Sequence, residues 1–301
     1  MIIVLLLALY FLYRHVFGVN SRRLAADDEV PNEDKHREYA KWVHNRIAEI
    51  KTVPFEEMRI RARDGVELYG RYYHRADGAP LVLMFHGYRS SCLRDGMGAF
   101  SFTEECGYNI LMVDQRAHRS SGGRTITFGV KERYDCLDWI LYLQKRFGVD
   151  TKMILIGLSM GASTVLMAAG LDLPENVKGV IADCGYSSPK EILQSVIKGM
   201  KLPVAPTYFL VRLSAMIYGG FDPNSASVGE ALGKTNVPVL LIHGEDDSFV
   251  PCEMSRRNYE ACASEKEILF VPGADHGMSY MTDTPKYVAT FTGFMQKYFE
   301  S

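Results

Sequence analysis

The sequence lacks the cysteine patterns that bind structural metals or build a disulfide framework. Its six cysteines form no C-x-x-C pair and no cluster with histidine at zinc spacing. In a chain of 301 residues we expect them to be separate, mostly buried thiols, which favours a reducing compartment; disulfide bonding is the alternative. The six are Cys92, Cys106, Cys136, Cys184, Cys252 and Cys262.

The chain also has no long basic run, no internal repeat and no low-complexity tract. Its formal net charge is −2, and binding driven by nucleic-acid phosphates needs clustered Lys and Arg. We therefore expect no nucleic-acid partner. The composition, 47% hydrophobic and 23% charged, is that of an ordinary globular chain able to bury a large core.

Only one long apolar run is present, and it opens the chain. Residues 1–13 carry no charge, Arg14 and His15 interrupt, and the apolar run then continues to Val19. As a helix, residues 1–19 would span roughly 28 Å, just enough for a thin bilayer. We expect an uncleaved, single-pass membrane anchor; a cleaved signal peptide and a buried core helix are the alternatives.

Positive charge follows this segment rather than preceding it. Arg14, Arg22 and Arg23 lie on its C-terminal side, and positive flanks tend to stay in the cytoplasm. The expected location is therefore the cell membrane, with the rest of the chain on the cytoplasmic face.

Residues 20–53 are predicted to hold a linker and an amphipathic helix. The stretch from Ser21 to Pro31 is polar, and Asn32 can cap a helix that starts after it. Tyr39, Val43, Ile47 and Ile50 share one helical face, and we expect that face to pack on the main domain.

From residue 54 onward, strand patterns alternate with helix-length stretches. Met58–Ala62 and Glu67–Tyr73 flank an Arg-Asp-Gly turn signal and predict an antiparallel hairpin. Six apolar runs typical of buried parallel strands follow, so residues 54–301 should form an α/β fold with a mainly parallel sheet and helices on both faces. The runs are Leu81–Phe85, Asn109–Val113, Met153–Gly157, Val177–Asp183, Val237–His243 and Glu267–Val271.

One interval is longer than a single helix requires. About fifty residues separate the strand at Val177 from the strand at Val237, and Pro203 and Pro206 divide them. We interpret residues 188–232 as a small helical cap over the carboxyl edge of the sheet, where open α/β sheets bind ligands.

The clearest chemical signal is the G-x-S-x-G motif at Gly157–Gly161. It lies between a predicted strand and a predicted helix, the context of a nucleophile elbow. Such a turn lifts the hydroxyl of Ser159 off the sheet, and the two glycines remove side chains that would clash with it. The alternative is that Ser159 only caps the helix.

A serine nucleophile needs a base, and in this fold the chain order is serine, acid, histidine. Only His243 and His276 follow Ser159. His243 ends a predicted strand, whereas His276 lies in a loop after the last strand and can reach over the sheet edge. We therefore predict His276 as the base; a solvated loop histidine is the alternative.

The remaining parts of a hydrolytic site are an acid and an oxyanion hole. Glu245, Asp246 and Asp247 all follow the preceding strand, and their spacing does not choose among them. The oxyanion donors are predicted to be the backbone N–H groups of Met160, after the nucleophile, and Tyr88, in the loop after the Leu81–Phe85 strand.

Taken together, these motifs resemble the α/β-hydrolase superfamily, in its branch of S33-type peptidases, esterases and monoacylglycerol-lipase-like enzymes. With the apolar first segment, the chain also resembles bacterial hydrolases of the membrane-anchored type. The resemblance covers residues 58–301. It is carried by His86–Tyr88, Asp114–His118, Gly157–Gly161, His243–Pro251 and Gly273–His276.

The resemblance implies more than the residues alone. The family's H-G-x-x-D-x-x-V pattern, which matches His243–Val250, places the acid at Asp247. The resemblance also implies that Asp114–His118 is a structural turn, near which Ala117 and Arg119 stand in place of usual glycines. It implies a serine hydrolase that cleaves an acyl or lipid-like ester through an acyl-enzyme, with no cofactor or metal. An S33-type aminopeptidase is the alternative, and a non-catalytic binding protein is a more distant one.

Overall fold

The structure, a computed structural model, describes residues 2–19 and 37–299, and an eight-stranded sheet lies at its centre. The strands follow the order β1-β2-β4-β3-β5-β6-β7-β8. β1 and β2 form the antiparallel hairpin, β2 pairs antiparallel with β4, and all other neighbours are parallel. The strands are β1 Glu56–Arg61, β2 Glu67–Tyr73, β3 Leu81–Phe85, β4 Asn109–Asp114, β5 Met153–Leu158, β6 Val177–Asp183, β7 Val239–Gly244 and β8 Lys266–Val271.

The predicted fold class is confirmed. β3, β4 and β7 are buried along their whole length, and β5 is buried except at its last residue, as expected of strands covered on both faces. The hairpin, whose burial is mixed, stands at one edge of the sheet. The structure describes all six cysteines, and none of them forms a disulfide bond.

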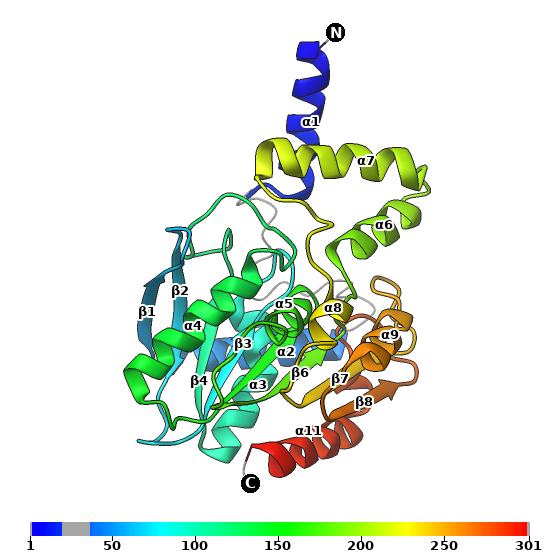
Figure 1. The fold of residues 1–301 in the computed structure, drawn as a ribbon. Coiled ribbons are helices and arrows are strands. Elements are labelled where there is room, and N and C mark those ends of the chain that lie inside the picture. The colour runs from blue at the N-terminus through cyan, green and yellow to red at the C-terminus, as the bar shows by residue number, and fades with distance from the viewer. Residues whose placement is uncertain (1, 20–36, 300–301) are drawn as a thin grey trace.

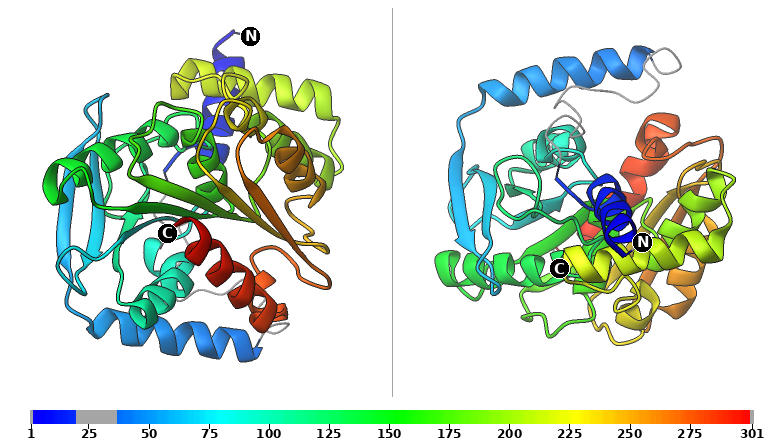
Figure 2. Two further views of the ribbon diagram at one scale, coloured as in Figure 1. Left: turned by 60° about the horizontal axis from the view of Figure 1, so that its bottom comes forward. Right: turned by 90° about the horizontal axis from the view of Figure 1, so that it is seen from above.

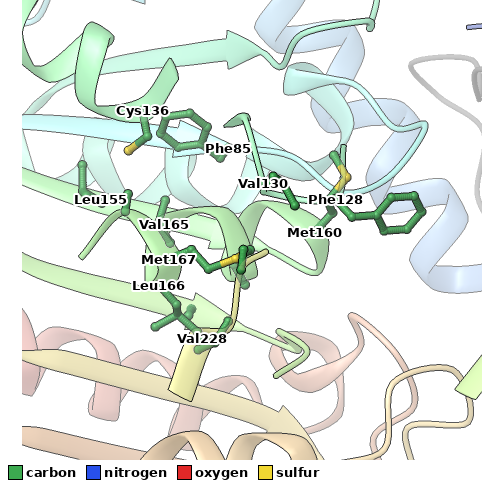
Figure 3. Packing of buried hydrophobic residues seen from close by; sticks show 14 of the residues in the cluster. Phe85, Phe128, Val130, Cys136, Leu155, Met160, Val165, Leu166, Met167 and Val228 are labelled. Atoms are coloured by element: carbon green, nitrogen blue, oxygen red, sulfur yellow. The ribbon is translucent and has the colours of Figure 1, made fainter. Parts of the chain in front are cut away.

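Helices cover both faces of the sheet (Figure 2). One face carries α4 (Glu132–Phe147) and α5 (Met160–Ala168), with α8 and α9 at its side. Phe85 and Leu155 of the sheet join Val165 and Leu166 of α5 in the core on this face (Figure 3). The shorter helices are α8 Val228–Leu232, α9 Glu253–Ala261 and α10 Ser279–Thr282.

The other face carries α3 (Cys92–Cys106) and α11 (Thr284–Tyr298), and α2 (Arg37–Thr52) forms a further layer outside them (Figure 2). On α2, Val43, Ile47 and Ile50 are buried in the core cluster of this face, as the stripe predicted. The predicted linker at residues 21–31 and the cap at Asn32 lie outside the described residues.

The long interval between β6 and β7 contains α6 (Pro189–Gly199), α7 (Val204–Ser214), a π-helical turn η2 (Ala215–Gly219) and α8. Figure 1 shows α6 and α7 at the same end of the molecule as α1 (Ile2–Val16). Tyr218 of η2 donates a hydrogen bond to the carbonyl of Leu6 at 2.9 Å. The interval is thus helical, and η2 packs against the first helix of the chain.

The predicted membrane anchor is wrong. Among the helices that the structure describes, none combines the length and the apolar character that crossing a bilayer requires. Because the predicted cell-membrane location and cytoplasmic orientation rested on that span, they are overturned with it.

The reason lies in where the helix ends and what its last residues contact. α1 has 15 residues, or roughly 22 Å of rise, against about 30 Å of hydrocarbon. The apolar run does not continue as a helix to Val19, because Phe17 turns into the core between the rings of Phe128 and Phe221, at 5.8 and 5.2 Å between centroids. The next residue, Gly18, forms a β-bridge with Thr125.

This packing predicts that the end of α1 is part of the folded core. Phe17 is 0% exposed, so Phe17→Ala should lower the free energy of unfolding by about 3–5 kcal/mol through the cavity it leaves. Urea denaturation measures the loss. Phe11→Ala is the matched control, since Phe11 is 67% exposed on the same helix and its loss should cost far less. Equal effects of the two substitutions would contradict the packing described here.

Candidate active site

Ser159 occupies a strained turn between β5 and α5. Its φ of 55° and ψ of −113° lie in a region that L-residues avoid, at a cost of about 1–3 kcal/mol. The turn requires both flanking glycines: a Cβ on Gly157 would come within 2.3 Å of Gly161, and a Cβ on Gly161 within 2.0 Å of the carbonyl of Phe85. The chain at this position is therefore compressed against its neighbours, and the serine projects from the end of β5.

The side chain of Ser159 does not cap α5, which was the alternative to a nucleophile. Its Oγ lies 3.0 Å from Nε2 of His276, and Nδ1 of His276 lies 2.7 Å from Oδ2 of Asp247. An ionised carboxylate can only accept hydrogen bonds, so Nδ1 carries the proton and Nε2 is left to accept from the serine hydroxyl. These three side chains, predicted from separate motifs, form one continuous hydrogen-bonded chain.

Among the three adjacent acids, only Asp247 reaches His276. Glu245 and Asp246 are exposed, whereas Asp247 is buried. Its other oxygen, Oδ1, accepts from the backbone N–H groups of Phe249 and Val250 at 2.9 and 2.7 Å. Burial alone would raise the pKa of Asp247, but these donors and the two histidines hold it well below its usual range. Asp247 is therefore ionised at neutral pH.

His243 has a supporting place behind this carboxylate. It is fully buried, with Nδ1 2.6 Å from Oγ of Ser255 and Nε2 2.9 Å from the carbonyl of Val250. Its Nε2 also lies 3.2 Å from Oδ2 of Asp247. His243 thus fixes the loop that carries the acid and does not approach Ser159.

The loop after β3 lies beside the nucleophile. A Cβ on Gly87 would come within 3.4 Å of the Cβ of Ser159, and the loop continues into Tyr88. Asp95 in the first turn of α3 holds this loop: its Oδ2 accepts from Gly87 N–H at 2.7 Å and its Oδ1 from the hydroxyl of Ser90 at 2.7 Å. Burial would raise the pKa of Asp95, yet Arg94 and these donors keep it below its ordinary value.

On the other side of Ser159 stands Met160, whose N–H begins α5. Its side chain is fully buried, in the same core cluster as Phe128 and Val130 (Figure 3). The two predicted oxyanion donors, Tyr88 and Met160, therefore belong to segments that flank the nucleophile. Asp95 holds the segment of Tyr88, and the buried side chain of Met160 holds its own.

Two buried histidines support the β3 loop from below. His86 accepts from Gln115 N–H at 3.0 Å, and His118 accepts from Arg89 N–H at 2.9 Å; their rings meet edge to face at 4.7 Å. Ala117 and Arg119, the two departures from glycine, have φ values of 64° and 44°. Both adopt the left-handed region, which explains why glycine suits these positions.

A cavity of about 560 Å³ opens at Ser159 and His276. Asp95, Asp183 and Asp275 are the carboxylates that line it in the described chain, and burial raises the pKa of Asp183 to about 6. Glu104, near the end of α3, pairs with Arg46 at 2.6 Å. Neither it nor Glu105 lines the cavity.

One group of side chains within the described ranges has metal-ligand spacing. Atoms of Cys184, Asp247 and His276 lie within 4.8 Å of one another. Burial raises the pKa of the Cys184 thiol well above its ordinary value, so it is protonated, and the other two side chains are hydrogen-bonded to each other. This group is therefore better suited to proton transfer than to holding a cation.

Sequence families agree with this geometry. A family described as "alpha/beta hydrolase fold" matches residues 80–205, and one described as "Serine hydrolase" matches residues 154–277. The chain is a hydrolase with the α/β hydrolase fold. The second match spans the region from β5 to the loop that carries His276.

Several curated relatives extend over most of the hydrolase. The uncharacterized protein YqkD of Bacillus subtilis is 27% identical over 247 residues, which is 80% of this chain and 81% of YqkD. Protein ABHD12B of Homo sapiens is 24% identical, covering 73% of this chain and 62% of its own. The lysophosphatidylserine lipase ABHD12 of Danio rerio is 25% identical, covering 72% and 56%.

Solved structures share the fold. The esterase Pf2001 of Pyrococcus furiosus superposes with a TM-score of 0.67 at 23% identity, covering 83% of this hydrolase and 93% of the esterase. Est1E of Butyrivibrio proteoclasticus, solved with bound ferulic acid, gives a TM-score of 0.63 at 20% identity, covering 81% and 100%.

Sequence reasoning missed Asp95 and the contribution of α2 to the cavity. Asp95 carries no motif of its own; its only signal is an acidic residue in a first helical turn, eight positions after Gly87. Tyr39 and Trp42 of α2 line the cavity. α2 comes before the first strand in the chain, and nothing in its sequence indicates that it reaches the cavity.

The contacts of Asp95 predict a positioning role for it in the hydrolase. Asp95→Ala leaves the Gly87 N–H without its acceptor, so the loop beside Ser159 loosens, and kcat should fall by roughly 10- to 100-fold with little change in KM. Asp95→Asn keeps one acceptor oxygen, so its kcat should lie between that of the parent enzyme and that of Asp95→Ala. Steady-state kinetics on an activated substrate decide this, and an unchanged kcat in Asp95→Ala would contradict the role.

The buried histidine pair predicts a pH-dependent stability. Burial lowers the pKa of His86 to about 4 and that of His118 to about 3, from an ordinary 6.5. As pH falls below 6.5 the unfolded chain binds protons that the folded chain does not, so the pair lowers the free energy of unfolding between pH 6.5 and about 3. Asp183, whose pKa is raised to about 6, acts in the opposite direction.

The variant His118→Gln isolates the contribution of one histidine to this pH dependence of stability. The amide oxygen of the glutamine can still accept from Arg89 N–H. Urea denaturation across this pH window should give a shallower acid-side loss in the variant than in the parent protein. Parallel pH profiles would show that His118 does not remain neutral in the folded state.

Proposed function

We propose that this hydrolase cleaves a carboxylic ester through a covalent acyl-enzyme, with Ser159 as nucleophile, His276 as general base and Asp247 as the acid that orients it. The observation that carries the proposal is the chain of contacts at 2.7 Å from Asp247 to His276 and 3.0 Å from His276 to Ser159. It is supported by the position of Ser159, half-buried on its strained turn and lining the cavity.

In the first half of the reaction, Oγ of Ser159 attacks the ester carbonyl carbon while Nε2 of His276 takes the hydroxyl proton. Asp247 holds the ring in the tautomer that can accept this proton and stabilises the imidazolium that forms. The tetrahedral intermediate then collapses: the C–O bond to the alcohol breaks, and His276 gives its proton to the leaving oxygen. An acyl group is left on Ser159.

In the second half, a water molecule takes the place of the alcohol. His276 accepts its proton, the hydroxide oxygen attacks the acyl carbon, and the carboxylic acid leaves as Ser159 regains the proton. The attack by Ser159 and the attack by water each form a tetrahedral intermediate that carries negative charge on the former carbonyl oxygen. The backbone N–H groups of Tyr88 and Met160 are proposed to stabilise that charge, each by roughly 3 kcal/mol.

An ester is preferred to an aminopeptidase substrate for a structural reason. An enzyme that removes N-terminal residues needs a free anion to hold the substrate amine. Asp95 is committed to Gly87, Ser90 and Arg94, and Glu104 is outside the cavity. The other two carboxylates that line the cavity are also engaged: Asp275 accepts from Ser248 and from the backbone N–H of His276, and Asp183 accepts from Ser279. An esterase and a lysophosphatidylserine lipase are among the similar proteins, which supports the same bond type.

Site-directed variants test the assignment with p-nitrophenyl butyrate. Ser159→Ala should lose hydrolysis above background, and Asp247→Asn should lower kcat by roughly 10⁴-fold because the wrong tautomer of His276 is favoured. Asp246→Asn is the matched control, because Asp246 is exposed beside Asp247 and should leave the rate unchanged. Full turnover by Ser159→Ala, or equal losses in the two aspartate variants, would refute the proposal.

A further inference from the structure

The cavity at Ser159 does not lie beneath the helical interval between β6 and β7. Its floor is the face of the sheet that carries Met84, Ile156 and Ile181, and its two side walls are α3 and α11. None of its lining residues in the described chain comes from residues 188–232. The interval that sequence reasoning took for a cap therefore contributes no wall to this cavity.

The depth of the cavity follows from the direction of its walls. α3 and α11 follow β3 and β8, so both helices run from the catalytic edge of the sheet toward the opposite edge. Asp95 stands beside the oxyanion loop, and Phe102 lies seven residues further along α3, or about 10 Å. There Phe102 meets Phe291 of α11 with ring centroids 4.4 Å apart, which joins the two walls at the far end.

α2 forms the roof. Tyr39, Trp42 and Val43 line the cavity from this helix, and the ring of Trp42 lies 5.9 Å from that of Tyr280 beside α11. Contacts with α3 and with the core hold this helix in place. Arg46 of α2 donates to Ser101 of α3 at 2.9 Å, and the apolar face of α2 is buried in the core.

Polar groups gather at the mouth of this space and apolar groups in its depth. Asp95, Asp183 and His276 are near Ser159, whereas Met97, Ala99, Phe102 and Phe291 line the space between α3 and α11. A charged group could not enter that space without losing its hydration, since these four apolar side chains offer it no polar partner. The shape suits an uncharged carbon chain that starts at the nucleophile.

We propose that this cavity holds the acyl chain of the substrate, and that the enzyme is selective for esters of medium-length apolar acids. The inference rests on the proposed function of Ser159 and adds the substrate class and the residues that limit its length. The acyl group, rather than the alcohol, is assigned to the apolar space between α3 and α11. His276, which protonates the alcohol, is 25% exposed, and its neighbour Phe249 is 47% exposed, so the alcohol has an open exit there.

Gly98 offers a direct test, because it is an exposed residue that lines the cavity, and a large side chain there would narrow the cavity. It lies on α3 among the lining residues, and a Cβ built there meets no atom within 4 Å. Gly98→Trp is also compatible with the helix, since glycine is a poor helix former. Gly293→Trp is the matched control: Gly293 is on α11, its Cβ likewise meets nothing within 4 Å, and it does not line the cavity.

The first readout is kcat/KM for the p-nitrophenyl esters of acetic, butyric, octanoic and dodecanoic acid. The parent enzyme and Gly293→Trp should prefer octanoate to acetate. In Gly98→Trp the octanoate-to-acetate ratio should fall by roughly tenfold or more, as methylenes lose their buried site. An unchanged ratio would overturn the proposal. So would selectivity that follows the length of the alcohol instead of the acid.

The second readout does not depend on catalysis. In a Ser159→Ala background, binding of 2-decanone is measured by calorimetry with and without Gly98→Trp. The ketone should bind to Ser159→Ala and lose roughly tenfold or more in affinity in the double variant, while Gly293→Trp has no effect. Equal affinities would overturn the cavity assignment. If Ser159→Ala still hydrolyses esters but the ketone responds as expected, the assigned nucleophile is wrong and the cavity assignment stands.

Discussion

The backbone of Ser159 is the constraint on which the rest of the site depends. A parallel strand ends and a helix begins within one residue there, and Ser159 takes up the change of direction with a positive φ. Gly161 lets the chain approach the carbonyl of Phe85, and Gly157 lets it approach Gly161, without a side chain in between. The same close approach brings the loop after β3 next to the nucleophile, so the turn creates both the raised hydroxyl and the neighbouring backbone N–H groups.

Charged and neutral groups around this turn are kept in the states that the proposed chemistry needs. Asp247 is ionised although it is buried, because two histidines and two backbone N–H groups donate to it. His86 and His118 are neutral for the opposite reason, since burial disfavours their cationic form and each accepts a backbone hydrogen bond. The loop beside Ser159 is thus held by Asp95 on one side and by the histidine pair on the other.

The parts of this molecule that the sequence could predict are the ones encoded locally. Buried parallel strands are continuous apolar runs, and the G-x-S-x-G motif occupies five consecutive residues. The strands of the sheet and the position of Ser159 could therefore be predicted from short segments. Asp247 could not be chosen by spacing from Glu245 and Asp246, because the choice depends on which carboxyl reaches a loop 29 positions away. Asp95 and the roof formed by α2 depend in the same way on contacts between distant segments.

The error at the N-terminus has a related cause. An apolar count along residues 1–19 does not show that the helix stops at Val16 or that Phe17 turns into the core. The cap interpretation of residues 188–232 used connection length alone, and length does not say which helix covers the cavity. Packing decides both points, and packing is a property of the whole fold.

The central claim is that Oγ of Ser159 becomes covalently bonded to the substrate acyl group. Peptide-level mass spectrometry of the enzyme after reaction with a fluorophosphonate tests it most directly, because this reagent reacts with a serine that an adjacent base activates. The account predicts one stoichiometric adduct, on Ser159, that does not form when His276 is replaced by Ala. An adduct on another residue, or an undiminished adduct on Ser159 in the His276→Ala protein, would contradict it.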